Sequence, residues 1–169
     1  MVLIGILALV GASQPASALS FTFIQNGYSE GAQITGSFEG LDLDENGQLS
    51  SFEDEIFAFS VTFSGNSLVP AFTLGMEDNF FALVYDIGSG FLGDGTALDE
   101  EGISATMDSF DYVTGQGPTG LDGGEVTNFI GLDTTAQLVV VTQVPEPTTS
   151  ILLALGLVGI AAGRRQAGA

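Results

Sequence analysis

Hydrophobic and polar residues alternate along most of the chain, and this alternation predicts β-strands. Alternating runs occupy residues 20–25, 33–38 and 55–63. A strand points residues of one parity to the same face. In the run at 55–63, that shared face carries Phe57, Phe59, Val61 and Phe63. We expect these four side chains to enter one hydrophobic core.

Two further runs, 80–85 and 138–141, are continuously apolar and predict strands that are covered on both faces. Clusters of Gly, Asn, Asp or Pro separate the runs and predict turns at 25–27, 65–67, 88–90, 115–118 and 122–124. No long helical period occurs between residues 19 and 143. The pattern predicts an all-β fold: a single antiparallel β-sandwich or jelly-roll domain over residues 19–143.

The first 18 residues predict a signal peptide. An apolar run spans residues 1–11, and Gln14-Pro15 then breaks it. Small residues at Ala16 and Ala18 give the cleavage pattern, so we expect a cut after Ala18. No Lys or Arg precedes the apolar run, which departs from the usual pattern. The alternative is a buried N-terminal strand or helix.

The other end of the chain predicts a short transmembrane helix. Pro145-Glu146-Pro147 is a stiff, non-helical entry, and residues 148–163 carry no charge. A helix of that length spans roughly 24 Å, close to the thickness of a bilayer core. Arg164-Arg165 follows, and positive charge stays on the cytoplasmic side. The alternative is a core helix of a soluble protein.

These C-terminal parts together resemble the PEP-CTERM sorting signal. The resemblance covers residues 144–169: the tripeptide Pro145-Glu146-Pro147, the apolar helix and the pair Arg164-Arg165. Four residues follow the basic pair, and family members often end closer to it. The resemblance implies that a membrane-embedded exosortase recognises the signal, removes the helix and releases the protein toward the cell surface. It also implies association with exopolysaccharide or biofilm matrix.

The region before the signal is similar to small exported PEP-CTERM proteins of the cyanobacterial type. The similarity lies in FTFIQNGYSEGAQITGSFEG at 21–40, FSGNSLVPAFTLG at 63–75 and YDIGSGFLGDG at 85–95. This resemblance implies a location outside the cytoplasm and implies no particular activity.

Composition excludes several classes of chemistry. The chain has 21 Asp and Glu residues against two Lys and Arg residues, no His or Cys, and a formal charge of −19. Nucleophile systems that need His or Cys, zinc sites built on these residues, and nucleic-acid binding are therefore not expected. A pair of carboxylates at the spacing of a glycosidase would not indicate that activity, because so many acidic residues make such pairs common. We predict that the protein is not an enzyme.

One acidic segment, residues 42–53, fits the twelve-residue calcium-loop pattern. Oxygen ligands at alternating positions, with a glycine at the sharp turn, are what Ca²⁺ requires. The expected ligands are Asp42, Asp44, Asn46, Gln48 through its carbonyl, Ser50 through water, and Glu53. Both flanks are predicted strands, so this is a loop between strands rather than an EF-hand. The alternative is a solvated acidic hairpin loop. A second acidic segment, 94–101, lacks this spacing and predicts only a solvated loop.

These features predict an exported protein of the cell surface or extracellular matrix, with a structural or adhesive role and a structural calcium ion. The precursor is expected to be anchored in the inner membrane by the C-terminal helix. Its expected partners are exosortase, the export machinery and exopolysaccharide. The alternative function is a carbohydrate-binding module, in which Tyr28, Tyr85 and Tyr112 would stack on sugar rings. The favoured interpretation of these tyrosines is nevertheless that they are ordinary core or edge residues of the sandwich.

Overall fold

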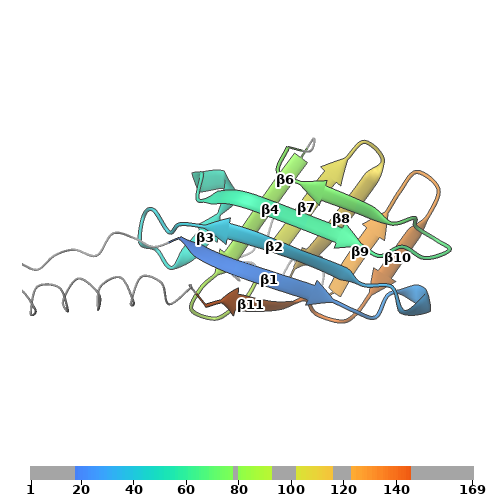
Figure 1. Ribbon diagram of the computed structural model, residues 1–169, viewed down its shortest axis with the longest axis horizontal. Coiled ribbons are helices and arrows are strands. Elements are labelled where there is room, and N and C mark those ends of the chain that lie inside the picture. Colours follow the sequence, from blue (N-terminus) through green and yellow to red (C-terminus); the bar gives the residue numbers. More distant parts are fainter. Residues whose placement is uncertain (1–17, 78–79, 93–101, 116–122, 146–169) are drawn as a thin grey trace, which may run out of the picture.

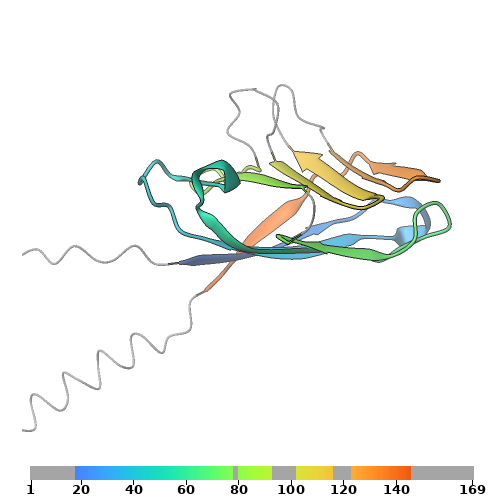
Figure 2. The same cartoon turned by 90° about the horizontal axis from the view of Figure 1, so that it is seen from above.

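The computed structural model describes residues 18–77, 80–92, 102–115 and 123–145, and these residues form two antiparallel β-sheets (Figure 1). The sheets lie in two layers, one above the other in Figure 2. The only helical elements among the described residues are two short 3-10 turns, η1 (Ser29–Gly31) and η2 (Ser51–Glu53). The all-β prediction is therefore confirmed over the described residues.

The first sheet, here called sheet A, has five strands in the order β11-β1-β2-β4-β5. Their bounds are β1 Leu19–Gln25, β2 Ile34–Gly40, β4 Ile56–Phe63, β5 Phe72–Gly75 and β11 Val140–Val144. Sheet B has six strands in the order β10-β9-β8-β7-β6-β3. Their bounds are β3 Gln48–Ser50, β6 Phe80–Asp86, β7 Gly102–Met107, β8 Phe110–Gly115, β9 Gly123–Thr127 and β10 Leu132–Thr135.

The order of strands along the chain favours a sandwich over a jelly roll. Strands β6 to β10 are consecutive neighbours in sheet B and form a meander. A jelly roll would instead contain two Greek keys. The chain returns to sheet A only with β11, which pairs with β1.

Aromatic side chains from both sheets fill the space between the layers. Phe21 of β1 stacks on Phe38 of β2 with ring centroids 4.8 Å apart. Both rings contact Tyr85 of β6, at 4.8 and 5.3 Å. Such contacts add to the hydrophobic free energy of burial. This cluster joins the two sheets into one hydrophobic core.

The prediction that Phe57 shares a buried face with Phe59 is wrong. Phe57 is 52 % exposed, whereas Phe59 is buried. The register between β2 and β4 shifts at Glu39/Gly40, so Gly40 pairs with Ile56 while Glu39 pairs with Ala58. Phe57 is the extra residue of this β-bulge, and Ile56 enters the core in its place.

The prediction that residues 138–141 are covered on both faces is also wrong. Leu138 and Val140 are 49 % and 58 % exposed. β11 begins at Val140 and lies at the edge of sheet A, where only β1 pairs with it. Val139 and Val141 are the residues of this run that contact the core.

A buried hydrogen-bond network connects the layers next to the aromatic core. The Gln25 side chain is fully buried, and its Oε1 accepts hydrogen bonds from Tyr28 and Tyr112 at 2.9 and 3.0 Å. Its Nε2 donates to Thr114 Oγ1 at 3.0 Å and to the Gln137 carbonyl at 2.9 Å. The amide thus has a partner for each of its oxygen and nitrogen atoms, as burial requires.

The start of β1, the end of β2 and the end of β11 lie at the same end of sheet A. Leu19 pairs with Gly40, and Ser20 pairs with Val144. The acidic loop follows Gly40 directly. This end therefore carries the beginning of the described chain, its end, and the predicted calcium loop (Figure 1).

Candidate functional site

The loop between β2 and β3 is shaped by its own acidic side chains. The Asp42 carboxylate accepts hydrogen bonds from the backbone N–H groups of Asn46 and Gly47, at 3.1 and 2.9 Å. Gly47 has a φ of 84°, a left-handed conformation that glycine adopts without a steric penalty. The chain therefore curls around the Asp42 carboxylate.

Asp44 and Asn46 complete this turn. Asp44 accepts hydrogen bonds from the backbone N–H and the side-chain amide of Asn46, at 3.1 and 2.9 Å. Asn46 Oδ1 in turn accepts a hydrogen bond from the N–H of Gln48 at 2.7 Å. The loop thus enters β3 with its polar groups bonded to one another.

Glu55, the residue before β4, supplies a third carboxylate. Its side chain is 1 % exposed. One carboxylate oxygen accepts a hydrogen bond from the N–H of Leu43 at 2.7 Å, and the other accepts from the N–H of Ser50 at 3.0 Å. Asp54, which precedes it, has a φ of 59° and ends the η2 turn. This reversal of the chain brings Glu55 back against the loop.

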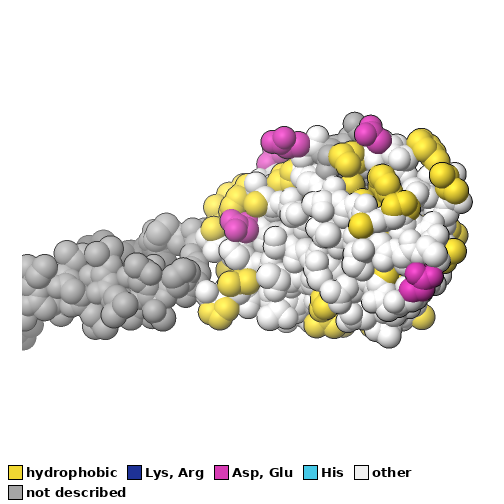
Figure 3. All heavy atoms as spheres, turned by 45° about the vertical axis from the view of Figure 1, so that its right-hand side comes forward, with side chains coloured by type: hydrophobic (Ala, Val, Ile, Leu, Met, Phe, Trp, Pro, Cys, Tyr) yellow, Lys and Arg dark blue, Asp and Glu magenta, His cyan; other side chains and the backbone are white. Residues whose placement is uncertain are grey.

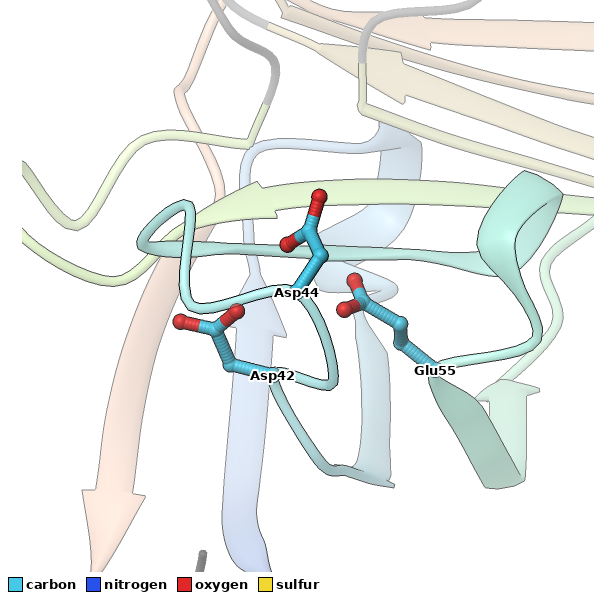
Figure 4. A group of neighbouring side chains, drawn as sticks. All are labelled: Asp42, Asp44 and Glu55. Atoms are coloured by element: carbon cyan, nitrogen blue, oxygen red, sulfur yellow. The ribbon is translucent and has the colours of Figure 1, made fainter.

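The carboxylates of Asp42, Asp44 and Glu55 converge (Figure 4), with one oxygen of each lying within 4.8 Å of the others. Calcium binds oxygen at 2.3–2.6 Å, so oxygens on one ion lie up to about 5 Å apart. The only basic side chains in the sequence are Arg164 and Arg165, and neither belongs to the described residues. The donor set and its spacing fit a hard divalent cation such as Ca²⁺.

Of the six predicted metal ligands, the structure brings only two into the carboxylate group. Asp42 and Asp44 belong to the carboxylate group, and Asn46 is hydrogen-bonded to both. Ser50 Oγ accepts a hydrogen bond from the N–H of Phe52 at 3.2 Å and caps η2. Glu53 lies within η2 and is exposed. Gln48 begins β3, where it pairs with Asp86.

Glu55 is the carboxylate that the twelve-residue spacing does not identify. In an EF-hand the twelfth residue lies in a helix, whereas here a short strand and a 3-10 turn follow the loop. These elements carry Glu53 outward and turn Glu55 inward. Residue parity gives no signal for this, because Phe57 has the same parity as Glu55 and Phe59 but is 52 % exposed.

A second group of polar residues closes the opposite end of the sandwich. Asp133 accepts hydrogen bonds from the N–H and hydroxyl of Ser29 at 2.9 and 3.0 Å, and from the Asn66 amide at 2.6 Å. Each of these residues comes from a different loop or strand. The group connects three elements: η1, strand β10 and the loop before β5. Its hydrogen bonds to one another account for these polar side chains without a ligand.

The three tyrosines are core residues. Tyr28, Tyr85 and Tyr112 are at most 5 % exposed. Burial raises the pKa of Tyr28 and Tyr112 above the ordinary tyrosine value, and the charges of Asp133 and Glu125 add to the effect at Tyr28. These rings are therefore buried within the described residues and are not exposed for stacking on sugars.

Most of the predicted targeting residues lie outside the described residues. These are Ala16, Glu146, Pro147, Arg164, Arg165 and the predicted span at 148–163. Ala18 and Pro145 are described, and both are exposed beside β1 and β11. In the ranges that the structure covers, no helix has the length and hydropathy needed to cross a membrane.

Comparison with known protein families identifies the C-terminal segment. A family model for the PEP-CTERM protein-sorting motif matches residues 143–166. The chain carries a PEP-CTERM sorting motif. This motif indicates a protein that is exported, anchored as a precursor and processed by an exosortase. No curated protein and no solved structure matches the chain.

The PEP-CTERM motif begins inside sheet A. Its first two residues, Gln143 and Val144, are the last two of β11, and they pair with Phe21 and Ser20 of β1. One residue, Pro145, separates Val144 from the residues beyond the described part. The matched motif and strand β11 thus share residues Gln143 and Val144.

Proposed function

We propose that the protein is a structural or adhesive component of the cell surface or extracellular matrix. The observation that carries this proposal is the PEP-CTERM motif that shares residues with strand β11 of the β-sandwich. The sequence also lacks the His, Cys and Lys side chains on which many catalytic mechanisms depend. A non-enzymatic role agrees with this composition.

We further propose that the loop at Asp42, Asp44 and Glu55 binds Ca²⁺ as a structural ion. Three converging carboxylates without a basic neighbour repel one another, and a divalent cation removes this repulsion. The ion would connect the β2–β3 loop to the start of β4. Extracellular calcium sites function at a Kd of roughly 10⁻⁴ to 10⁻³ M, so a modest site suffices in an exported protein.

Thermal unfolding of the purified full-length protein tests the calcium site. A ligand that binds only the folded state at about 100 times its Kd stabilises that state by about 2.7 kcal/mol. We expect the unfolding midpoint to rise with CaCl₂ and to fall with a chelator, while MgCl₂ has a smaller effect. Equal midpoints in calcium and chelator, at matched ionic strength, would contradict the site.

The exopolysaccharide partner is a separate proposal with its own test. The acidic surface carries scattered carboxylates and no described basic side chain (Figure 3). Direct binding of an acidic polysaccharide is therefore unfavourable unless divalent cations bridge the two polyanions. We expect an acidic polysaccharide to retain the protein in CaCl₂ and to release it in chelator. Retention that is independent of calcium would instead favour a carbohydrate-binding module.

A further inference from the structure

Strand β11 presents an open edge at one side of sheet A. It pairs with β1 on one side, and no described strand lies on the other. All of its residues except Val141 are exposed, including Val140 at 58 % and Val144 at 40 %. An open edge offers unpaired backbone groups to any other strand of matching geometry.

This edge lacks the features with which proteins usually block edge pairing. Residues 134–145 contain no charged side chain, and the register of β11 with β1 is continuous over all five residues. Charges, bulges and very short strands normally protect an exposed edge. The other three edges each have one such feature: β5 is four residues long, β10 contains Asp133, and β3 has three residues beside the acidic loop.

The distribution of charge favours contact at this side of the molecule. Although the chain carries 21 acidic residues, only Glu39 lies within the strands of sheet A. Two copies of a strongly acidic protein repel each other wherever their carboxylates meet. The acidic loop lies at the Val144 end of sheet A, but residues 134–145, which include β11, carry no charged side chain, so this repulsion is small along the β11 edge itself. A second copy of the same chain is therefore a suitable occupant.

We propose that β11 pairs antiparallel with β11 of a second copy, which joins the two A sheets into one continuous sheet. Pairing all five residues places the two-fold axis at Thr142, so that Val140 of one copy lies opposite Val144 of the other. A two-fold interface of this kind uses the same surface twice and closes at the dimer. Backbone hydrogen bonds supply its affinity, and the exposed valines supply apolar contact.

This geometry has a consequence for the proposed adhesive role. Each PEP-CTERM segment leaves its sheet at the Val144 end of β11. In an antiparallel pair these two ends point in opposite directions. The pair therefore joins copies on two facing surfaces, or copies that have been released, rather than two neighbours anchored in one membrane. The pairing goes beyond the proposed function and does not depend on the calcium site.

Cysteine crosslinking of the full chain tests both the pairing and its direction. The natural sequence contains no cysteine, so each introduced thiol is unique. The Val140→Cys and Val144→Cys variants, one of them tagged, are mixed, exposed to a short bismaleimide and separated by mass. We expect mixed dimers of Val140→Cys with Val144→Cys. Dimers of each variant with itself, in place of mixed dimers, would indicate parallel pairing and overturn the proposal.

Two controls keep the test specific. Thr73→Cys places an exposed thiol on β5, the opposite edge of sheet A, and should give no crosslinked dimer.

The double variant Val140→Lys/Val144→Lys should sediment with the mass of one chain, whereas the unaltered protein sediments with the mass of two. Its far-ultraviolet circular dichroism should stay unchanged, which separates lost pairing from lost folding. A single-chain mass for the unaltered, folded protein at all concentrations would overturn the proposal.

Repeating the crosslinking in a chelator separates this inference from the calcium proposal. We expect mixed dimers in chelator as well as in CaCl₂, provided that the protein remains folded. Mixed dimers without any effect of calcium on thermal unfolding would remove the calcium site and leave the pairing intact. A calcium effect on unfolding without mixed dimers would remove the pairing and leave the calcium site intact.

Discussion

Ser20 lies directly opposite Val144 in the ladder between β1 and β11. The first strand after the predicted signal-peptide cleavage site is thus bonded to the strand in which the PEP-CTERM motif begins. Sheet A is complete only when the last described strand of the chain has joined the first. Processing must therefore cut beyond Val144 if the sheet is to keep its fifth strand.

Glu55→Gln should abolish the stabilisation by calcium. The variant removes one of three converging charges and places an amide NH₂ where a carboxylate oxygen accepts an N–H. Without calcium we expect the free energy of unfolding to fall by at most about 3 kcal/mol, because the lost hydrogen bonds to a buried charge outweigh the relieved repulsion from Asp42 and Asp44. Thermal and urea unfolding in calcium and in chelator measure both effects.

Glu53→Gln is the matched control for this prediction. Glu53 lies two residues away, is exposed and does not belong to the carboxylate group. Its substitution should change the free energy of unfolding by less than about 0.5 kcal/mol and should leave the response to calcium intact. A loss of the calcium response in Glu53→Gln but not in Glu55→Gln would instead support the twelve-residue ligand set.

Gln25→Leu should destabilise the protein strongly although the side chain keeps nearly the same size. The hydroxyl groups of Tyr28 and Tyr112 both donate to Gln25 Oε1 and would lose their acceptor inside the core. Unsatisfied buried polar groups cost about 1–3 kcal/mol each, so we expect the two hydroxyl groups together to lower the free energy of unfolding by about 2–6 kcal/mol. Urea unfolding measures this. The exposed Gln33→Leu variant should show almost no change, and an equally small change in Gln25→Leu would refute the role of the network.

The protein should lose stability as the pH rises above about 10. Burial raises the pKa of Tyr28, Tyr85 and Tyr112 above the ordinary tyrosine value near 10. Above pH 10 the unfolded chain releases phenolic protons that the folded chain retains. The contribution of the protonated tyrosines to the free energy of unfolding is therefore complete below pH 10 and declines above it. Phenolate absorbance at 295 nm should rise only together with the loss of the β-sheet circular dichroism signal. Phenolate formation near pH 10 in the folded protein would contradict this.

Phe59→Ala and Phe57→Ala should differ in cost although both lie on β4. Phe59 is 7 % exposed, and its truncation leaves a core cavity that costs about 3–5 kcal/mol. Phe57 lies at the bulge and is 52 % exposed, so its truncation should cost less than about 1 kcal/mol. Denaturant unfolding of the two variants measures the difference. Equal costs would mean that the bulge does not turn Phe57 outward.

The alternation of residues predicted the type of fold but not the details that depend on distant partners. The strands at 20–25 and 55–63 were predicted because one face of each packs on the core. The bulge at Phe57 depends on pairing with β2, and the exposure of β11 depends on its place at the sheet edge. Neither relationship has a local signal.

Glycine gave a misleading signal in one segment. Gly123 and Gly124 were predicted to form a turn, but both lie in β9. A Cβ atom at Gly124 would lie 2.1 Å from Gln25 Oε1 and 2.5 Å from the Tyr28 hydroxyl. The glycine therefore makes room for the buried network, and no pattern within the segment distinguishes that role from a turn.

The candidate site was predicted in part. The loop residues Asp42 and Asp44 followed from spacing alone, because the backbone turn that positions them is local. Glu55 could not be found from the loop pattern, since its position depends on η2 and on the reversal at Asp54. The sorting motif was predicted at 144–169 from contiguous residues, and the family match at 143–166 confirms its presence.

The intact mass of the protein from the membrane and extracellular fractions of its producing cells tests the central claim most directly. Export and sorting by the PEP-CTERM motif predict an extracellular species that begins near Leu19, retains β11 and lacks the apolar segment with Arg164-Arg165. A species found only in the membrane fraction, with Arg164-Arg165 still attached, would contradict the claim that the β-sandwich is released.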